Sequence, residues 1–273
     1  MLTIQSVQSI PLQGGAGRQV RLVLQPTNPQ EHDPFIILAD DQFAHNTFAD
    51  HPHKGIQTVT YVIDGSLEHY DSKTNGGGRL NPGDFQIMTA GRGIIHNENP
   101  DPGQEARVLQ LWVNLSSEHK KVDGQYEDLA HKNVPVTEFD GGKIEVYAGE
   151  MNGAKSPMKL FTPFIFAAVT VENGAAELVI PAQYNSYLYV LEGSITIQDQ
   201  TIQPHQVVRF DSSNEIGSIP FSAISAARFV IFAGLPIKEP IAARGPFVMN
   251  TEEEIKEAYA SYRNGTFLDG VPY

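Results

Sequence analysis

A short segment that occurs twice is the feature that most constrains how this chain can fold. Residues 61–66 read Tyr-Val-Ile-Asp-Gly-Ser, and residues 189–194 read Tyr-Val-Leu-Glu-Gly-Ser, 128 positions later. Each copy is an apolar β-type run that ends in an acidic residue and a glycine, which predicts a strand leading into a tight turn. The chain has 273 residues, so it can hold two copies of one β unit.

Other short runs rich in valine, isoleucine, threonine, tyrosine and phenylalanine recur along the chain between glycines and prolines. They lie at residues 57–63, 85–89, 108–114, 143–147, 164–171, 187–191, 194–198 and 226–232. Runs of this length at short intervals predict an all-β sandwich or barrel. The polar segment 116–131 is interpreted as a connection, which divides the chain into an N-terminal barrel at 1–130 and a C-terminal barrel at 131–273.

One helix is predicted near the C-terminus. Thr251 and Glu254 have the spacing of a capping box, in which each side chain bonds to the backbone at the position of the other. Ile255, Tyr259 and Tyr262 follow at the spacing of one helical face, and the next Asn-Gly pair predicts the end of the helix. We therefore expect a short helix that packs on a barrel and closes the C-terminal domain.

Composition excludes several classes of function. The chain has no cysteine, which rules out disulfides, thiolate-held clusters and a cysteine nucleophile. The net charge of −13 would repel a phosphate backbone, so no direct nucleic-acid binding is expected. No apolar stretch is long enough to span a membrane, and the first residues do not resemble a signal peptide. We expect a cytoplasmic protein with no membrane association.

Two histidine pairs have a spacing that suits metal binding. His51 and His53 are two residues apart, as are His96 and Glu98. Residues i and i+2 of a strand point to the same face, so each pair presents two donor groups on one side. If the two strands meet inside a barrel, three imidazoles and one carboxylate converge, a donor set that suits a first-row divalent metal. Two unrelated polar pairs on separate strands are the alternative.

The motifs around these pairs resemble a known family. Residues 51–65, from His-Pro-His-Lys-Gly to Asp-Gly, resemble the first cupin motif, and residues 82–98 resemble the second. More narrowly, Met-Thr-Ala-Gly-Arg-Gly-Ile-Ile-His at 88–96, Leu-Gln-Leu-Trp-Val-Asn-Leu at 109–115 and Gly-Pro-Phe-Val-Met-Asn at 245–250 are similar to the pirin family.

The resemblance implies a bicupin, which is two consecutive cupin β-barrels of jelly-roll type. It also implies one divalent metal ion, usually Fe(II), with Mn, Co, Ni, Cu or Zn as alternatives. The ligands carried over are His51, His53, His96 and Glu98. The positions of the second barrel that correspond to them hold no comparable donors, so that barrel is expected to lack a metal.

One position departs from the family pattern. Cupins of this kind usually carry glutamate where this chain has Gln57. Gln57 is an even number of residues from His51 and His53, so in a continuous strand we expect it to face the same interior. A neutral amide cannot act as a general base, but it can orient water or substrate near the metal. Phe43, Phe48, Met88 and Ile94 lie near the motifs in sequence and are the expected apolar walls.

The resemblance leads to two functional hypotheses. The first is a metal-dependent oxygenase similar to quercetin 2,3-dioxygenase, which acts with O2 on a flavonol or a related aromatic diol or enol. The second is a non-enzymatic regulator, a metal redox sensor or transcription cofactor whose partner is another protein. An isomerase or a storage protein, and a metal site with only a structural role, are further alternatives.

Overall fold

The computed structural model describes residues 1–72 and 77–268. Its internal contacts divide the chain into two compact units. The first barrel unit comprises Leu12–His131 and Ile237–Tyr273, and the second comprises Met1–Pro11 and Lys132–Pro236. The chain changes unit beside the expected boundary at 130, but its two ends differ from the expectation. Each end belongs to the barrel that is otherwise built from the opposite half of the sequence.

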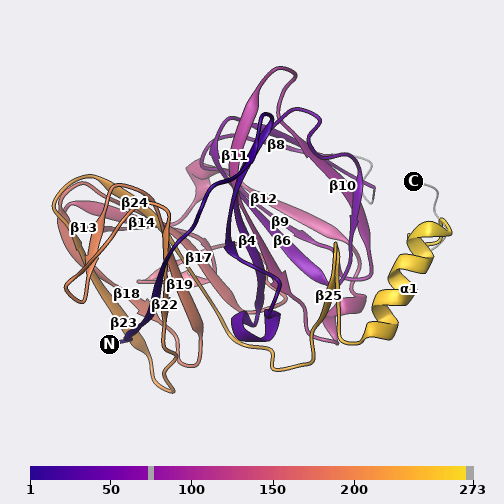
Figure 1. Cartoon of the computed structure of the whole chain (residues 1–273). Coiled ribbons are helices and arrows are strands. Elements are labelled where there is room, and N and C mark those ends of the chain that lie inside the picture. The colour runs from indigo at the N-terminus through magenta and orange to yellow at the C-terminus, as the bar shows by residue number, and fades with distance from the viewer. Residues whose placement is uncertain (73–76, 269–273) are drawn as a thin grey trace. The chain divides into compact units, whose positions relative to one another are not determined.

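The first barrel unit has a seven-stranded sheet and a four-stranded sheet (Figure 1). The seven-stranded sheet has the order β12-β9-β6-β11-β4-β3-β2, the four-stranded sheet has the order β5-β10-β7-β8, and β25 and β26 form a separate hairpin. The elements are β2 (Gln13–Gly15), β3 (Arg18–Leu24), η1 (Pro29–His32), β4 (Phe35–Ala44), β5 (His51–His53), β6 (Ile56–Asp64), β7 (Leu67–Asp71), β8 (Arg79–Leu80), β9 (Phe85–Thr89), β10 (Ile94–Asn99), β11 (Glu105–Asn114), η2 (His119–Lys121), β12 (Gln125–Leu129), β25 (Ala242–Arg244), β26 (Phe247–Met249) and α1 (Glu252–Arg263).

The second barrel unit repeats this plan. Its seven-stranded sheet has the order β1-β22-β19-β24-β17-β14-β13, its four-stranded sheet has the order β18-β23-β20-β21, and β15 and β16 form a hairpin. The elements are β1 (Ile4–Ser9), β13 (Val136–Phe139), β14 (Gly142–Ala148), β15 (Glu150–Met151), β16 (Ala154–Lys155), β17 (Phe164–Val171), β18 (Gly174–Ile180), β19 (Asn185–Glu192), β20 (Ile195–Ile197), β21 (Gln200–Ile202), β22 (Gln206–Phe210), β23 (Gly217–Ala223) and β24 (Ala227–Gly234), with η3 (His131–Asn133) at the change of unit.

The sequence repeat occupies the same place in both units. The two copies form the ends of β6 and β19, which are the third strands of their seven-stranded sheets. Gly65 and Gly193 follow with φ of 72° and 66°, a conformation that favours glycine. A Cβ atom would lie 2.3 Å from the carbonyl oxygen of Glu105 at the first and 2.2 Å from that of Ala226 at the second. The duplicated turn therefore requires glycine in each barrel.

Strands β9 and β22 hold equivalent places in the two units, and each pairs with an edge strand. The origin of these edge strands explains why the N-terminal segment belongs to the second unit. In the first unit β12 pairs with β9, and in the second unit the N-terminal strand β1 pairs with β22. An unpaired sheet edge exposes backbone groups, so β1 satisfies an edge that the second half of the chain leaves open.

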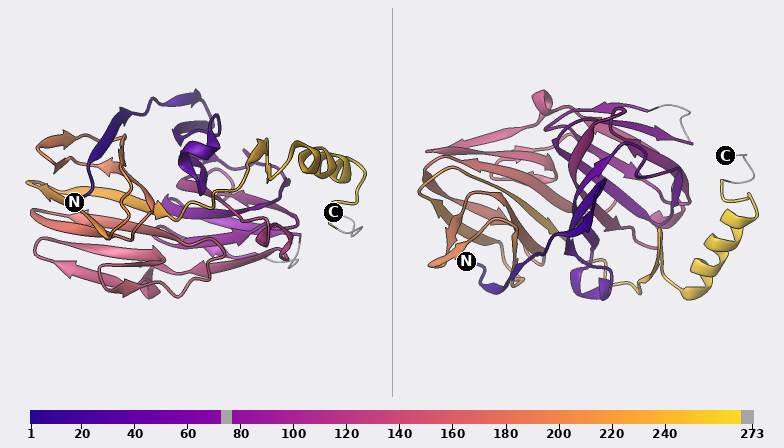
Figure 2. Two further views of the ribbon diagram at one scale, coloured as in Figure 1. Left: turned by 90° about the horizontal axis from the view of Figure 1, so that it is seen from below. Right: turned by 45° about the horizontal axis from the view of Figure 1, so that its top comes forward.

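Helix α1 confirms the predicted capping box. Thr251 accepts from the Glu254 backbone, and the Glu254 side chain accepts from the Thr251 backbone. Ile255 and Ala258 are buried against Phe247 and Phe267 in a cluster of the first unit. Figure 2 shows the helix beside the β25–β26 hairpin. Among the described residues, no helix combines the length and apolar character that a membrane span requires.

The interiors of the two units differ in chemistry. In the second unit one continuous apolar cluster includes Leu188 and Val190 of β19. The residues of β6 at the matching positions of the repeat are Thr60 and Val62. The first unit therefore places a polar side chain where the second has only hydrocarbon, and this polar region contains the candidate site.

Candidate metal centre

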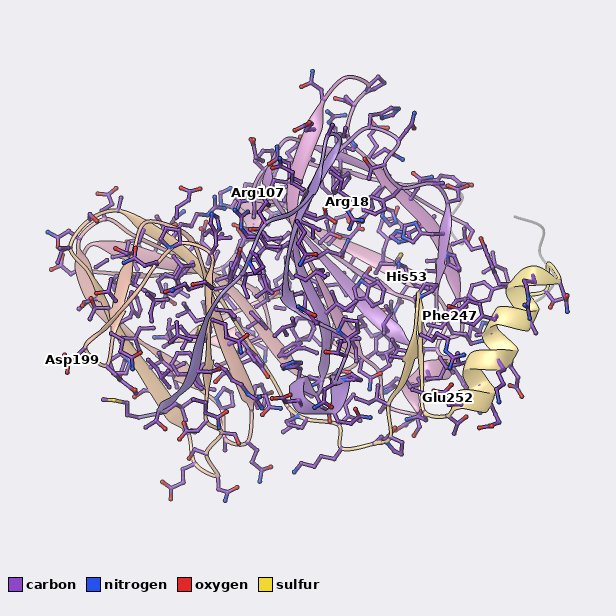
Figure 3. The ribbon with its side chains drawn as sticks, viewed as in Figure 1. Arg18, His53, Arg107, Asp199, Phe247 and Glu252 are labelled. Atoms are coloured by element: carbon purple, nitrogen blue, oxygen red, sulfur yellow. The ribbon has the colours of Figure 1, made fainter. Side chains whose placement is uncertain are left out.

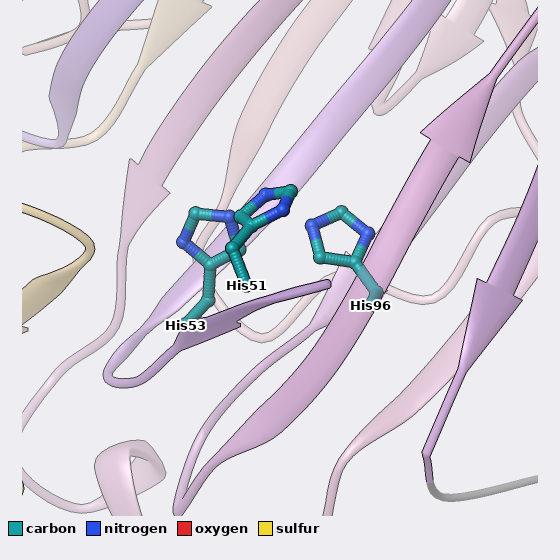
Figure 4. Close-up of side chains that lie close together, drawn as sticks. All are labelled: His51, His53 and His96. Atoms are coloured by element: carbon teal, nitrogen blue, oxygen red, sulfur yellow. The ribbon is translucent and has the colours of Figure 1, made fainter. Parts of the chain in front are cut away.

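Strands β5 and β10 bring three histidines together. The strands pair antiparallel with His96 opposite His51 and Ile94 opposite His53, so the three imidazoles lie on one face. The ring centroids of His51 and His96 are 4.4 Å apart, those of His51 and His53 are 5.0 Å apart, and those of His53 and His96 are 5.1 Å apart. Figure 4 shows the rings converging from the two strands. One nitrogen of each ring lies within 4.8 Å of the others.

Backbone carbonyl groups orient two of these rings. The Ala49 carbonyl lies 2.9 Å from Nδ1 of His51, and the Pro246 carbonyl lies 3.3 Å from Nδ1 of His53. A carbonyl oxygen only accepts, so Nδ1 carries the proton in both contacts, which leaves Nε2 as the nitrogen that can bind a metal. This arrangement is typical of metal-ligating histidines, whose second nitrogen donates to a carbonyl or carboxylate.

The buried rings are uncharged at neutral pH. Burial, and then the neighbouring His51, lowers the pKa of His53 to about 3. Burial, and then the other histidines, holds the pKa of His96 well below its usual value. Neutral imidazoles are the form that binds a metal. Within the described residues, neither ring nitrogen of buried His96 has a hydrogen-bond partner, and a bound ion would be coordinated by one of the two. These three residues therefore fit a divalent metal.

Glu98 lies two residues beyond His96 and lines the same cavity as the three histidines. Its Oε1 accepts from the Thr60 hydroxyl at 2.8 Å, and its Oε2 accepts from the Gln110 amide at 2.8 Å. Burial would raise the pKa of Glu98, but His69 and Thr60 hold the pKa below its usual value. Glu98 is thus an ionised carboxylate with an orientation set by two donors.

His69 belongs to the same site, although the sequence motifs did not single it out. It lies on β7 opposite Glu98, and its nitrogens are 4.0 Å from the Glu98 carboxylate and 3.8 Å from that of Asp71. Burial would lower the pKa of His69, but the two carboxylates outweigh it and raise the pKa to about 9. With His96 and Glu98 it forms a second close group of donors. The sequence holds a signal that could indicate His69 as a site residue, because His69 and Asp71 have the same spacing as His96 and Glu98.

Gln57 does not face the histidines, contrary to the expectation that it shares the face of His51 and His53. Gln110 and Trp112 of β11 line the cavity, and their partners on β6 are Thr60 and Thr58. Directly paired residues share a face, so even-numbered positions of β6 point to the cavity and Gln57 points away. It is fully buried and donates to the Thr89 hydroxyl at 2.9 Å. The cause is Gly55, whose φ of 81° interrupts the alternation between β5 and β6.

The cavity in front of the histidines has a volume of about 270 Å³. Its apolar wall includes Leu22, Phe43, Phe48, Val108 and Trp112. Of the walls expected from the sequence, Phe43 and Phe48 line it, whereas Met88 and Ile94 pack in a separate buried cluster.

An ion pair stands beside the apolar wall of this cavity. Arg18, which is labelled in Figure 3, makes a bidentate contact with Asp41, with a shortest distance of 2.7 Å, and lies 4.8 Å from the ring centroid of Phe48. Both Arg18 and Asp41 line the cavity. The space therefore combines a flat hydrophobic surface with polar groups confined to the histidine end and to this ion pair.

Comparison with known proteins identifies the family. A family model described as "Pirin" matches residues 19–113, and one described as "Pirin C-terminal cupin domain" matches residues 166–268. Pirin-like protein 2 of Arabidopsis thaliana is 39% identical over 262 residues, which cover 92% of this chain and 80% of that protein. The chain belongs to the pirin family. The bicupin architecture expected from the motifs is confirmed with it.

Two solved structures of similar fold support this assignment. GK1651 from Geobacillus kaustophilus has a TM-score of 0.85 and 39% identity, covering 88% of this chain and 98% of that one. A quercetin 2,3-dioxygenase from Acinetobacter baumannii has a TM-score of 0.87 and 30% identity, covering 98% of both chains. The histidine and glutamate groups of this pirin-family chain are a donor set that could hold a metal ion.

Proposed function

We propose that this pirin-family protein is a metal-dependent oxygenase that acts with O2 on a flavonol or a similar aromatic diol or enol. The observation that carries the proposal is the cavity, in which an apolar wall faces three histidines and an ionised glutamate. The similarity to a quercetin 2,3-dioxygenase along the whole chain supports the same chemistry.

His51, His53, His96 and Glu98 would hold the metal, with Fe(II) as the first candidate. When bound there, such an ion would lower the pKa of a substrate hydroxyl and supply the redox chemistry needed for reaction with dioxygen. Phe48 and Trp112 offer ring faces against which a flat substrate can lie. The volume of about 270 Å³ lies just below the roughly 300–1,000 Å³ typical of ligand pockets, which favours a compact aromatic molecule.

The protein side chains would position the reacting groups. Thr60 and Gln110 hold the Glu98 carboxylate, so it cannot rotate freely when a ligand enters. Glu98 is ionised and can accept a proton from a substrate hydroxyl. Gln57 lies on the opposite face of β6, so a base at that position is not needed for this arrangement. The apolar wall excludes water from the space next to the histidines.

Turnover of a flavonol tests the proposal. Protein is loaded anaerobically with Fe(II) and mixed with quercetin, and O2 is then admitted. We expect loss of the flavonol absorbance and release of carbon monoxide. The variant His96→Ala should show neither, whereas His131→Ala, which removes an exposed histidine outside the cavity, should match wild type.

Absence of turnover with each of Fe, Mn, Co, Ni and Cu, in protein shown to bind the metal, would refute the oxygenase. A metal-dependent regulator would remain in that case. A pull-down whose captured partner changes with the oxidation state of the metal, together with the absence of turnover, would favour it.

A further inference from the structure

A segment near the C-terminus contacts the residues that carry one proposed metal ligand. We define the C-terminal strap as residues 242–263, which comprise β25, β26 and α1. The strap joins the segment after β5 through a parallel bridge between Phe247 and Lys54 and a bond of 3.0 Å from the Val248 amide to the Lys54 carbonyl. One residue earlier on each segment, the Pro246 carbonyl accepts from Nδ1 of His53. Figure 3 labels His53 and Phe247 on these segments.

A buried lysine fixes the strap to the same loop. Nζ of Lys120 donates to the carbonyls of Gly55 and Val248 at 3.0 and 2.9 Å, and to Oδ1 of Asn114 at 2.7 Å. Gly55 is required at this contact, because a Cβ atom there would lie 1.9 Å from the Val248 carbonyl oxygen. The loop that follows His53 therefore accepts no side chain while the strap is docked.

The strap also packs behind the second ligand strand. Phe247 is fully buried, with ring centroids 4.8 Å from Tyr259 and 5.5 Å from Phe267. Ile95, the residue before the proposed ligand His96, belongs to the same apolar cluster. Pro246 itself lines the cavity. The strap thus contacts the backs of both strands that carry the histidines and closes part of the cavity wall.

We infer that the C-terminal strap is a positioning element of the metal site, so that docking of the strap and binding of the metal stabilise each other. The strap orients His53 through the Pro246 carbonyl, and loss of such a partner typically weakens metal binding about 10–100-fold. Coupling between two binding events is reciprocal, so a bound metal must hold the strap closed by the same factor. The inference rests on the metal site of the proposed function but not on its oxygenase chemistry.

Amide hydrogen exchange on the wild-type protein tests the coupling without a substitution. Exchange of residues 242–263 is compared in metal-free protein and in protein saturated with Ni(II). We expect about 10–100-fold slower exchange in the strap with the metal, while β14 of the second barrel unit stays unchanged. In His53→Ala the strap should show no such slowing. Equal strap exchange with and without Ni(II) in wild type that binds the ion would overturn the inference.

Metal affinity provides the reverse measurement. Lys120→Met removes the bond to the strap at Val248 together with the bonds to Gly55 and Asn114, and Lys256→Met alters an exposed lysine of α1 as a matched control. Titration with Co(II), followed by its visible spectrum, should show about 10–100-fold weaker binding in Lys120→Met and wild-type binding in the control. If the strap amides of Lys120→Met exchange rapidly and the variant still binds Co(II) as tightly as wild type, the inference is overturned. If Lys120→Met fails to fold, the wild-type exchange experiment decides.

Loss of turnover alone would not count against the coupling. A protein that binds Ni(II) and slows exchange of its strap, yet leaves quercetin intact, would retain this inference and lose the proposed oxygenase function.

Discussion

Lys120 should make the stability of the first barrel unit depend on pH in the neutral to alkaline range. Its side chain is 2% exposed, and burial lowers its pKa from 10.5 to about 7, although Glu239 and Glu254 act in the opposite direction. Because the native pKa is below the unfolded value, the unfolded chain binds the proton more tightly between these limits. The charge therefore destabilises the fold fully below pH 7, and the effect disappears as the pH rises toward 10.5.

The size of this effect follows from the two pKa values. One pKa unit corresponds to about 1.4 kcal/mol, so burying the ammonium group costs about 4 kcal/mol at pH 7 and about 2 kcal/mol at pH 9. Lys120→Met lacks the titrating group. Relative to this variant, the wild type should gain about 2 kcal/mol in free energy of unfolding between pH 7 and pH 9.

Denaturant unfolding at a series of pH values checks the prediction. Trp112 is the one tryptophan in the sequence and lies in the same unit as Lys120, so its fluorescence reports the relevant transition. The comparison uses metal-free protein, and the difference between wild type and variant removes titrations common to both. A difference that stays constant from pH 7 to pH 9 would refute the reasoning. It would mean that the three oxygen acceptors keep Lys120 charged with an ordinary pKa.

Three further substitutions test other contacts. Gln57→Leu should destabilise the protein by about 1–3 kcal/mol through the lost bond to Thr89 and leave Ni(II) affinity unchanged; a large loss of affinity would return Gln57 to the metal site. Thr60→Val removes a donor to Glu98 and should weaken Co(II) binding roughly 10-fold with little change in the unfolding midpoint; unchanged binding would show that Gln110 alone orients the carboxylate. Phe247→Ala should lower the stability of the first barrel unit by about 3–5 kcal/mol, as measured by Trp112 fluorescence, and a shift below about 1 kcal/mol would contradict its role in the core.

Much of the fold was predictable because its signals are local. Valine-rich runs, acidic-glycine turns and the capping box at Thr251 depend on neighbouring residues, and they predicted an all-β chain with one terminal helix. The duplicated turn also indicated two units, and Gly65 and Gly193 occupy equivalent positions in them. The exchange of the chain ends was not predictable in this way, since strand pairing between β1 and β22 joins residues about 200 positions apart.

The site shows the same division between local and long-range information. The alternation within a strand predicts that His51 and His53 share a face, and the pairing of β5 with β10 puts His51 opposite His96. The alternation rule gives the wrong face for Gln57, because one glycine with positive φ reverses the alternation. The spacing of residues in the sequence does not reveal such a reversal. The contact of Pro246 with His53 could not be predicted either, because it joins a backbone carbonyl to a ring 193 positions away.

The exchange of chain ends also affects how the protein is made on the ribosome. The partner of β1, strand β22, is synthesised about 200 residues after it, on the order of 10–40 s at usual translation rates. The first barrel unit receives its C-terminal strap only after Lys132–Pro236 of the second unit has been synthesised. A nascent chain therefore carries two unfinished barrels until β24 has been made, and either half expressed alone would lack a strand or a helix that its barrel uses.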